Sequence, residues 1–178
     1  MKKCTLFNLD ATIGVRSLKT ALTCVLCALL YLPFGRSPAF ACIGVIFGTG
    51  GGMDDSKLNG GNRLMGTIIG GLIGMILFRL YILVYPDGSF HLFILPFLFV
   101  GVLVLIYACQ FFKWNGGVQP GGVVLSIIFF NTPVDTYISY SLNRMFDTAV
   151  GVVLALLVAY LLPKERVIKI FNKLKHKQ

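Results

Sequence analysis

Residues 62–85 read NRLMGTIIGGLIGMILFRLYILVY, and this stretch decides the fold class. Its apolar part, from Leu64 to Tyr85, exceeds the about 20 apolar residues that a helix needs to cross a bilayer. The apolar residues form a continuous run, whereas a transmembrane β-strand alternates over about 10 residues. Because only helices and closed barrels span membranes, the stretch predicts a membrane-spanning helix.

The rest of the chain continues this pattern. Of its 178 residues, 56% are hydrophobic and 13% are charged, compared with about 25% charged residues in a soluble domain. Apolar segments are predicted at residues 18–34, 38–52, 64–85, 90–112, 116–130 and 145–162. The polar stretch 54–63 is expected to be a loop. We predict an all-α, polytopic membrane helix bundle of six transmembrane helices, which leaves no polar domain for a soluble enzyme on a membrane anchor.

The net charge of +9 comes from 16 Lys and Arg residues against 7 Asp and Glu residues. In a soluble protein such an excess would suggest nucleic acid, but in this apolar chain we interpret it as a topology signal and expect no nucleic-acid partner. Six crossings put both termini on one side, and that side collects 13 of the 16 basic residues. The positive-inside rule therefore predicts a multi-pass protein of the plasma (cytoplasmic) membrane with both termini in the cytoplasm.

The chain divides into two parts of different composition. Residues 1–163 are predicted to form the transmembrane domain, and residues 164–178 a basic amphipathic cytoplasmic tail. Such a segment typically lies on the anionic cytoplasmic leaflet. Docking of the tail to a partner protein is the alternative.

An internal repeat appears when the sequence is shifted by 81 residues. The pattern Asn62-Arg63-x-x-x-Thr67-x-x-Gly70 then meets Asn143-Arg144-x-x-x-Thr148-x-x-Gly151, and the short segment 38–52 meets the short segment 116–130. The halves, about 14–85 and 90–163, hold three segments each and so enter the membrane in opposite senses. Two inverted three-helix repeats are a recurring plan of secondary transporters. The alternative is that the duplication only builds a stable bundle.

Small residues recur at helical spacing in the two matching segments. They are Gly66, Gly70 and Gly74 in the first half, and Gly151 and Ala155 in the second. Small residues allow helix backbones to approach closely in lipid, where no hydrophobic effect drives helices together. We therefore assign these positions to helix packing rather than to substrate contact.

Two arginines are the candidates for binding a substrate. Arg63 and Arg144 each stand four residues before a threonine, Thr67 and Thr148, so each pair shares one helix face. We expect both arginines near helix N-termini, where the positive dipole end adds to their charge and suits an anion. The alternative is that they reach to lipid headgroups.

Asp147 takes the place of a small residue on an apolar helix, next to Arg144. A carboxylate inside a membrane is costly and is by default a functional candidate. It is expected either to form an ion pair with Arg144 or to take up and release a proton.

No constellation for catalysis, metal binding or cofactor binding is found in the sequence. The five cysteines lie mostly in apolar runs without the partners of a metal or redox site, and no G-x-S-x-G or phosphate-binding glycine motif is complete. The sequence therefore predicts no enzyme, no metal and no cofactor.

Four motifs resemble those of the FUSC superfamily, which includes the fusaric-acid-resistance and aromatic acid exporter proteins. They are R-S-L-K-T-A at 16–21, P-A-F-A at 38–41, N-R-L-M-G-T-I-I-G at 62–70 and N-R-M-F-D-T-A-V-G at 143–151. The resemblance covers about residues 10–163. It implies a six-helix module that exports aromatic or other organic carboxylates, a homo-oligomer such as a dimer, and anion-facing roles for Arg63 and Arg144.

The sequence thus supports two hypotheses from different classes. The leading one is an exporter of aromatic or other organic carboxylate anions across the plasma membrane, with the lipid bilayer, a small organic anion and a second copy of the chain as partners. The alternative is a non-transporting membrane scaffold or assembly protein, in which the arginines and Asp147 only hold helices together.

Overall fold

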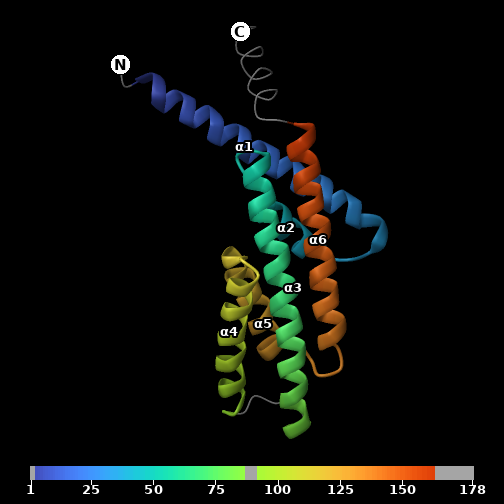
Figure 1. Cartoon of the computed structure of the whole chain (residues 1–178). Helices are drawn as coiled ribbons and strands as arrows, with labels where there is room; N and C mark the ends of the chain where they lie inside the picture. Colours follow the sequence, from blue (N-terminus) through green and yellow to red (C-terminus); the bar gives the residue numbers. More distant parts are fainter. Residues whose placement is uncertain (1–2, 87–91, 163–178) are drawn as a thin grey trace. The chain divides into compact units, whose positions relative to one another are not determined.

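The computed structural model describes residues 3–86 and 92–162, and of residues 3–16 the backbone only. This part of the chain is helical and contains no strand (Figure 1). The six α-helices are α1 (Lys3–Tyr31), α2 (Ala39–Gly48), α3 (Met53–Val84), α4 (Ile94–Phe111), α5 (Val118–Asn131) and α6 (Tyr137–Leu161). Two short 3-10 helices, η1 (Leu32–Phe34) and η2 (Asn115–Gly117), precede α2 and α5. The predicted all-α class is confirmed.

Four of the helices are long and apolar enough to cross a membrane. These are the stretch Ser17–Phe34, α3, α4 and α6. At about 1.5 Å per residue, the 10 residues of α2 reach about 15 Å and the 14 residues of α5 about 21 Å, against a hydrocarbon core of about 30 Å. The described residues thus contain six α-helices. That α2 and α5 also cross the membrane stays a prediction.

Helices α3 and α6 begin well before the apolar segments that predicted them. Helix α3 begins at Met53 rather than Leu64, so the supposed loop 54–63 is helical. Helix α6 begins at Tyr137, eight residues before the predicted start of the apolar segment. The polar first turn of α3 is stable as a helix because the carboxylates of Asp54 and Asp55 lie at the positive end of the helix dipole. Polar residues at the start of a helix were thus misread as a connection.

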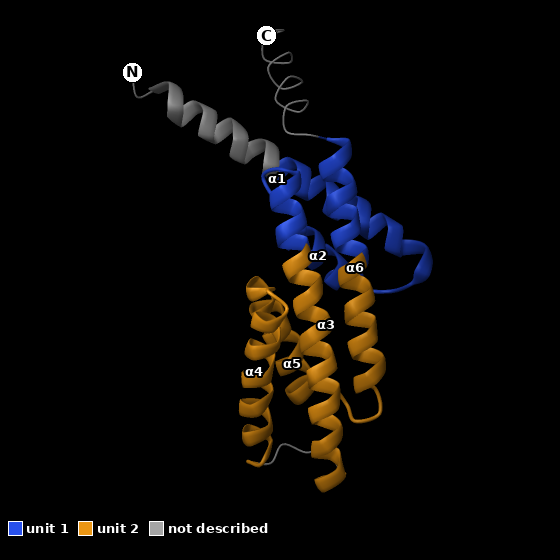
Figure 2. Cartoon of the chain, viewed as in Figure 1, with its two compact units in different colours: residues 1–60, 150–178 blue, residues 61–149 orange. Residues whose placement is uncertain are grey.

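The described helices divide between two compact units (Figure 2). Unit 1 comprises residues 1–60 and 150–178, and unit 2 comprises residues 61–149. Helices α3 and α6 each contribute one part to both units. The predicted basic tail, residues 164–178, lies outside the described residues.

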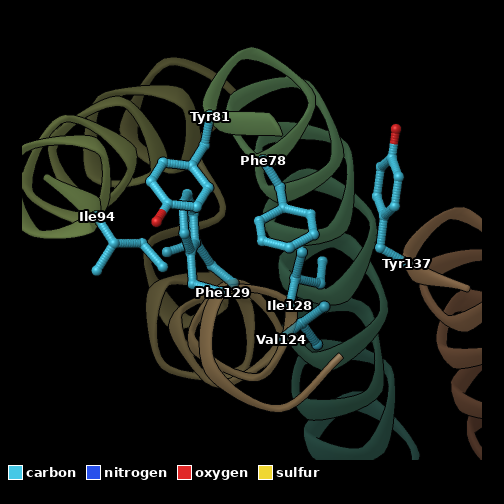
Figure 3. Packing of buried hydrophobic residues seen from close by; sticks show 8 residues of the cluster. Phe78, Tyr81, Ile94, Val124, Ile128, Phe129 and Tyr137 are labelled. Atoms are coloured by element: carbon cyan, nitrogen blue, oxygen red, sulfur yellow. The ribbon is translucent and has the colours of Figure 1, made fainter. Parts of the chain in front are cut away.

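An aromatic core holds unit 2 together. The ring of Phe78 on α3 meets Phe129 of α5 edge-on at 5.8 Å and Tyr137 of α6 edge-on at 5.3 Å between ring centroids. Figure 3 shows these rings together with Tyr81 and Ile94, which are almost completely buried. Edge-to-face pairs of this kind stabilise a core beyond their buried area. The cluster ties α3, α4, α5 and the start of α6 into one body.

The core of unit 1 is smaller and joins α1 to α2. Cys27 and Tyr31 of α1 pack against Ala41 and Val45 of α2, and all four side chains are buried. Val150 and Leu154, on the part of α6 in this unit, pack against the same cluster. Unit 1 is therefore built around the short helix α2.

Candidate functional site

Five polar residues singled out by the sequence lie on α3 and α6 within unit 2. We call them the α3–α6 polar site: Arg63, Thr67, Arg144, Asp147 and Thr148. Thr67, Asp147 and Thr148 are buried, with exposed fractions of 1%, 6% and 2%, while both arginines are half-buried. Buried polar side chains in a membrane-spanning chain are costly unless other groups pair with them.

The contact between Gly71 and Met145 sets the level at which α3 and α6 meet. A Cβ atom on Gly71 would lie 2.6 Å from Cε of Met145, and the two helices run in opposite directions (Figure 1). Thr67 lies four residues before Gly71, and Thr148 three residues after Met145. At a rise of about 1.5 Å per residue, these two threonines lie at the same level to within about one turn. Asp147 shares that level.

Arg63 and Arg144 do not share it. Counted from the same contact, their Cα atoms lie about two and a half helical turns, roughly 13 Å, apart along the helix axes. Side chains on a helix lean toward its N-terminus, so in antiparallel helices these two lean away from each other. The arginines therefore flank the buried threonines on either side, and one small carboxylate group would meet them one at a time.

The expectation that both arginines lie near helix N-termini is wrong. Arg63 is ten residues beyond the start of α3, and Arg144 is seven residues beyond the start of α6. The dipole acts mainly within the first turn. Any attraction of an anion must therefore come from the guanidinium groups themselves.

Arg144 interacts with an aromatic ring and with a carboxylate. Its Cζ atom is 4.2 Å from the centroid of the Tyr140 ring, one turn earlier on α6. Asp147, on the following turn, acts electrostatically on the same guanidinium, whose Nη1 atom is buried. The aromatic face and the negative charge both stabilise a cation that is partly withdrawn from solvent.

Arg63 and Thr67 are linked along their own helix. The Thr67 hydroxyl donates a hydrogen bond of 2.8 Å to the carbonyl oxygen of Arg63, and Nε of Arg63 is buried. A threonine has a single O–H donor, and here the backbone uses it. In this arrangement Thr67 offers lone pairs rather than a proton, so it would have to rotate to donate to an anion.

The small residues lie where helix backbones approach one another. In unit 2, a Cβ on Gly66 would meet the carbonyl oxygen of Gly117, and one on Gly70 would meet that of Gly121. A Cβ on Gly74 would lie 2.7 Å from Cδ1 of Ile128. These three glycines therefore line the face of α3 that packs against η2 and α5.

The matching small residues of α6 face α2 within unit 1. A Cβ on Gly151 would meet the carbonyl oxygen of Ala41, and one on Gly48 would lie 3.3 Å from the Cβ of Ala155. The second-half stripe thus packs against the first short helix, as the first-half stripe packs against the second short helix.

Sequence reasoning missed two contacts near the arginines, that of Tyr140 with Arg144 and that of Asn62 with η2. Tyr140 beneath Arg144 could have been found from its spacing, since an aromatic residue four positions before an arginine lies on the same helix face. Asn62 packs against η2, where a Cβ on Gly116 would lie 2.5 Å from its Nδ2. That contact joins distant segments and has no local sequence signal apart from the repeated Asn-Arg pair.

No group of three or more His, Cys, Asp or Glu side chains that could hold a metal ion is found within the described ranges.

The sequence model of a protein family, described as aromatic acid exporter family member 1, matches residues 11–162 of the chain. No curated protein and no solved structure matches the chain. The family match covers nearly the whole described region and agrees with the resemblance of the four motifs.

Proposed function

Because the chain belongs to the aromatic acid exporter family, we propose that it carries aromatic or other organic carboxylate anions out of the cell across the plasma membrane. The family is one of membrane exporters rather than enzymes, and the four long apolar helices make the chain an integral, multi-pass membrane protein. The observation that carries the substrate class is the pair of half-buried arginines that flank buried hydroxyls on α3 and α6.

The α3–α6 polar site suits stepwise passage of an anion. A carboxylate that reaches Arg63 gains a charge-assisted hydrogen bond, and its next cationic contact is Arg144, about two and a half turns away along the helices. At Arg144 it competes with Asp147 for the same guanidinium. The anion must therefore displace Asp147 from Arg144 in order to bind there.

The proposed architecture has six crossings in two inverted repeats, both termini in the cytoplasm, and two copies of the chain in the working unit. Support for the repeat comes from packing within each unit. The glycine stripe of α3 faces α5 in unit 2, and the small-residue stripe of α6 faces α2 in unit 1. The 81-residue shift pairs these same elements, α3 with α6 and α5 with α2.

Flux from loaded vesicles tests the proposal. The full chain is reconstituted into liposomes that contain labelled benzoate, and release is followed after an outward gradient is imposed. We expect release well above that of protein-free liposomes, with competition from other aromatic carboxylates. Release no faster than from protein-free liposomes, for benzoate and for a panel of other organic acids, would contradict the proposal.

The scaffold alternative is favoured by one observation, the stabilisation of Arg144 by Tyr140 and Asp147, which a purely structural arginine would also need. It predicts that a partner protein is captured by the full chain and lost when residues 164–178 are deleted. It also predicts no flux. Pull-down with both versions, beside the flux assay, separates the two functions.

A further inference from the structure

Helices α1 and α2 bring two cysteines together within unit 1. Sγ of Cys24 lies 3.9 Å from the carbonyl oxygen of Cys42, and Sγ of Cys42 lies 3.7 Å from the carbonyl oxygen of Cys24. The contacts are reciprocal, so both thiols occupy the same gap between the two helices. Disulfides require Cβ atoms about 3.5–4.5 Å apart, and side chains that each touch the other residue's backbone are close to that arrangement.

Access distinguishes this pair from the other cysteines whose side chains the structure describes. Cys27 and Cys109 have exposed fractions of 0%, whereas Cys24 and Cys42 are only partly buried. Cys27 lies one turn from Cys24 and packs in the core against Ala41. Among these four described cysteines, only Cys24 and Cys42 combine close approach with access for a reagent from outside the core, as a redox-active thiol requires.

We propose that Cys24 and Cys42 form a redox-sensitive pair that closes to a disulfide when an organic hydroperoxide reaches the membrane. One thiol, as its thiolate, attacks the peroxide oxygen and the O–O bond breaks, which gives a sulfenic acid and an alcohol. The second thiol attacks the sulfenic sulfur, the S–S bond forms, and the S–O bond breaks with loss of water. The balance is two thiols and one hydroperoxide to one disulfide, one alcohol and one water.

The bond would restrain the helix around which unit 1 is built. Residues 24 and 42 lie on either side of the connection that contains η1 and Gly35, whose φ of 59° makes the tight turn. The same helix α2 supports Gly151 of α6 through Ala41. Oxidation would therefore fasten α1 to α2 and limit any movement of α2 against its neighbours.

Thiol counting on the purified full chain tests the pair. The protein is treated with cumene hydroperoxide in detergent, unfolded, labelled with a maleimide and weighed. We expect the labelled cysteines to fall from the five in the sequence to three. Tryptic digestion should then yield a disulfide-linked pair of peptides, 20–36 and 37–57, that dithiothreitol separates. Five labelled cysteines after treatment would overturn the proposal.

Peptide 20–36 also contains Cys27, so variants decide which thiol reacts. Cys24→Ser and Cys42→Ser should each abolish the linked pair, whereas Cys27→Ser should keep it. Loss of the pair in Cys27→Ser together with its retention in Cys24→Ser would refute the assignment. If a variant elutes as an aggregate, fragmentation of the wild-type linked peptides locates the bond at Cys24 or at Cys27 and decides the same question.

Discussion

The guanidinium of Arg144 lies over the Tyr140 ring and interacts electrostatically with Asp147. An arginine within a candidate span is costly unless its charge is compensated, and these two residues supply that compensation. They also fix the direction of the side chain. A substrate carboxylate would therefore meet a cation that is already held in place, which lowers the entropy lost on binding.

Tyr140→Leu removes the aromatic face while keeping an apolar side chain of similar reach. A cation–π contact at a partly exposed site contributes about 0.5–1 kcal/mol, which corresponds to a factor of about 2 to 5 in affinity. We expect KM for carboxylate release from proteoliposomes to rise by that factor. Tyr140→Phe keeps the ring and serves as the control, so an equal effect of both variants would refute the role of the ring.

The close approach of the α3 and α5 backbones predicts that a single added methyl group lowers the stability of the protein. In Gly70→Ala the new Cβ would meet the backbone of Gly121, which forces α3 and α5 apart. Overpacking costs about 1–3 kcal/mol, more than the about 1 kcal/mol that alanine gains over glycine in a helix. We expect a lower Tm in detergent. Gly122→Ala is the matched control, since its Cβ lies 4.0 Å from Leu105 Cδ2, and it should leave Tm unchanged or higher.

At the scale of elements, apolar runs are readable from the sequence and polar helix starts are not. Residues 64–85 predict a helix because composition alone identifies a spanning segment. The helical turns from Met53 to Arg63 were not predicted, because a stretch of polar residues is equally typical of a loop and of an exposed helix start. The levels of Arg63 and Arg144 could not be predicted either. Spacing within one helix places a residue on a face, but contacts between helices, such as those of Gly71 with Met145 and of Phe78 with Tyr137, are needed to relate α3 to α6.

The short helices α2 and α5 decide the topology. If both cross the membrane, residues before and after α2 lie on opposite sides, whereas a four-crossing chain keeps them on the same side. Ser37 precedes α2 and is exposed, and a side chain at Gly52 would meet nothing within 4 Å. Both positions therefore accept a reporter cysteine.

We expect Ser37→Cys and Gly52→Cys, each in a cysteine-free background, to react with a membrane-impermeant maleimide from opposite sides. Ser37→Cys should be labelled in intact cells and Gly52→Cys only after permeabilisation. Labelling of both from the same side would show that α2 does not cross and would remove the six-crossing topology.

At the scale of the whole molecule, the excess of positive charge has separate parts. Six of the basic residues lie in the stretch 164–178. Most of the others lie in predicted loops, where their distribution indicates which side of the membrane each loop is on. Arg63 and Arg144 remain, half-buried on the two helices that contribute to both units. The proposed function depends on these two arginines and on their separation along α3 and α6.

The most direct test of the account is the rate of benzoate release from proteoliposomes that contain the variant Arg63→Ala/Arg144→Ala. The matched control is Lys57→Ala, which removes an exposed cation from the start of α3. The variant and the control must first elute like the wild type on size exclusion. We predict that the double variant releases benzoate no faster than protein-free liposomes, while Lys57→Ala keeps the wild-type rate. Release by the double variant at the wild-type rate would contradict the account.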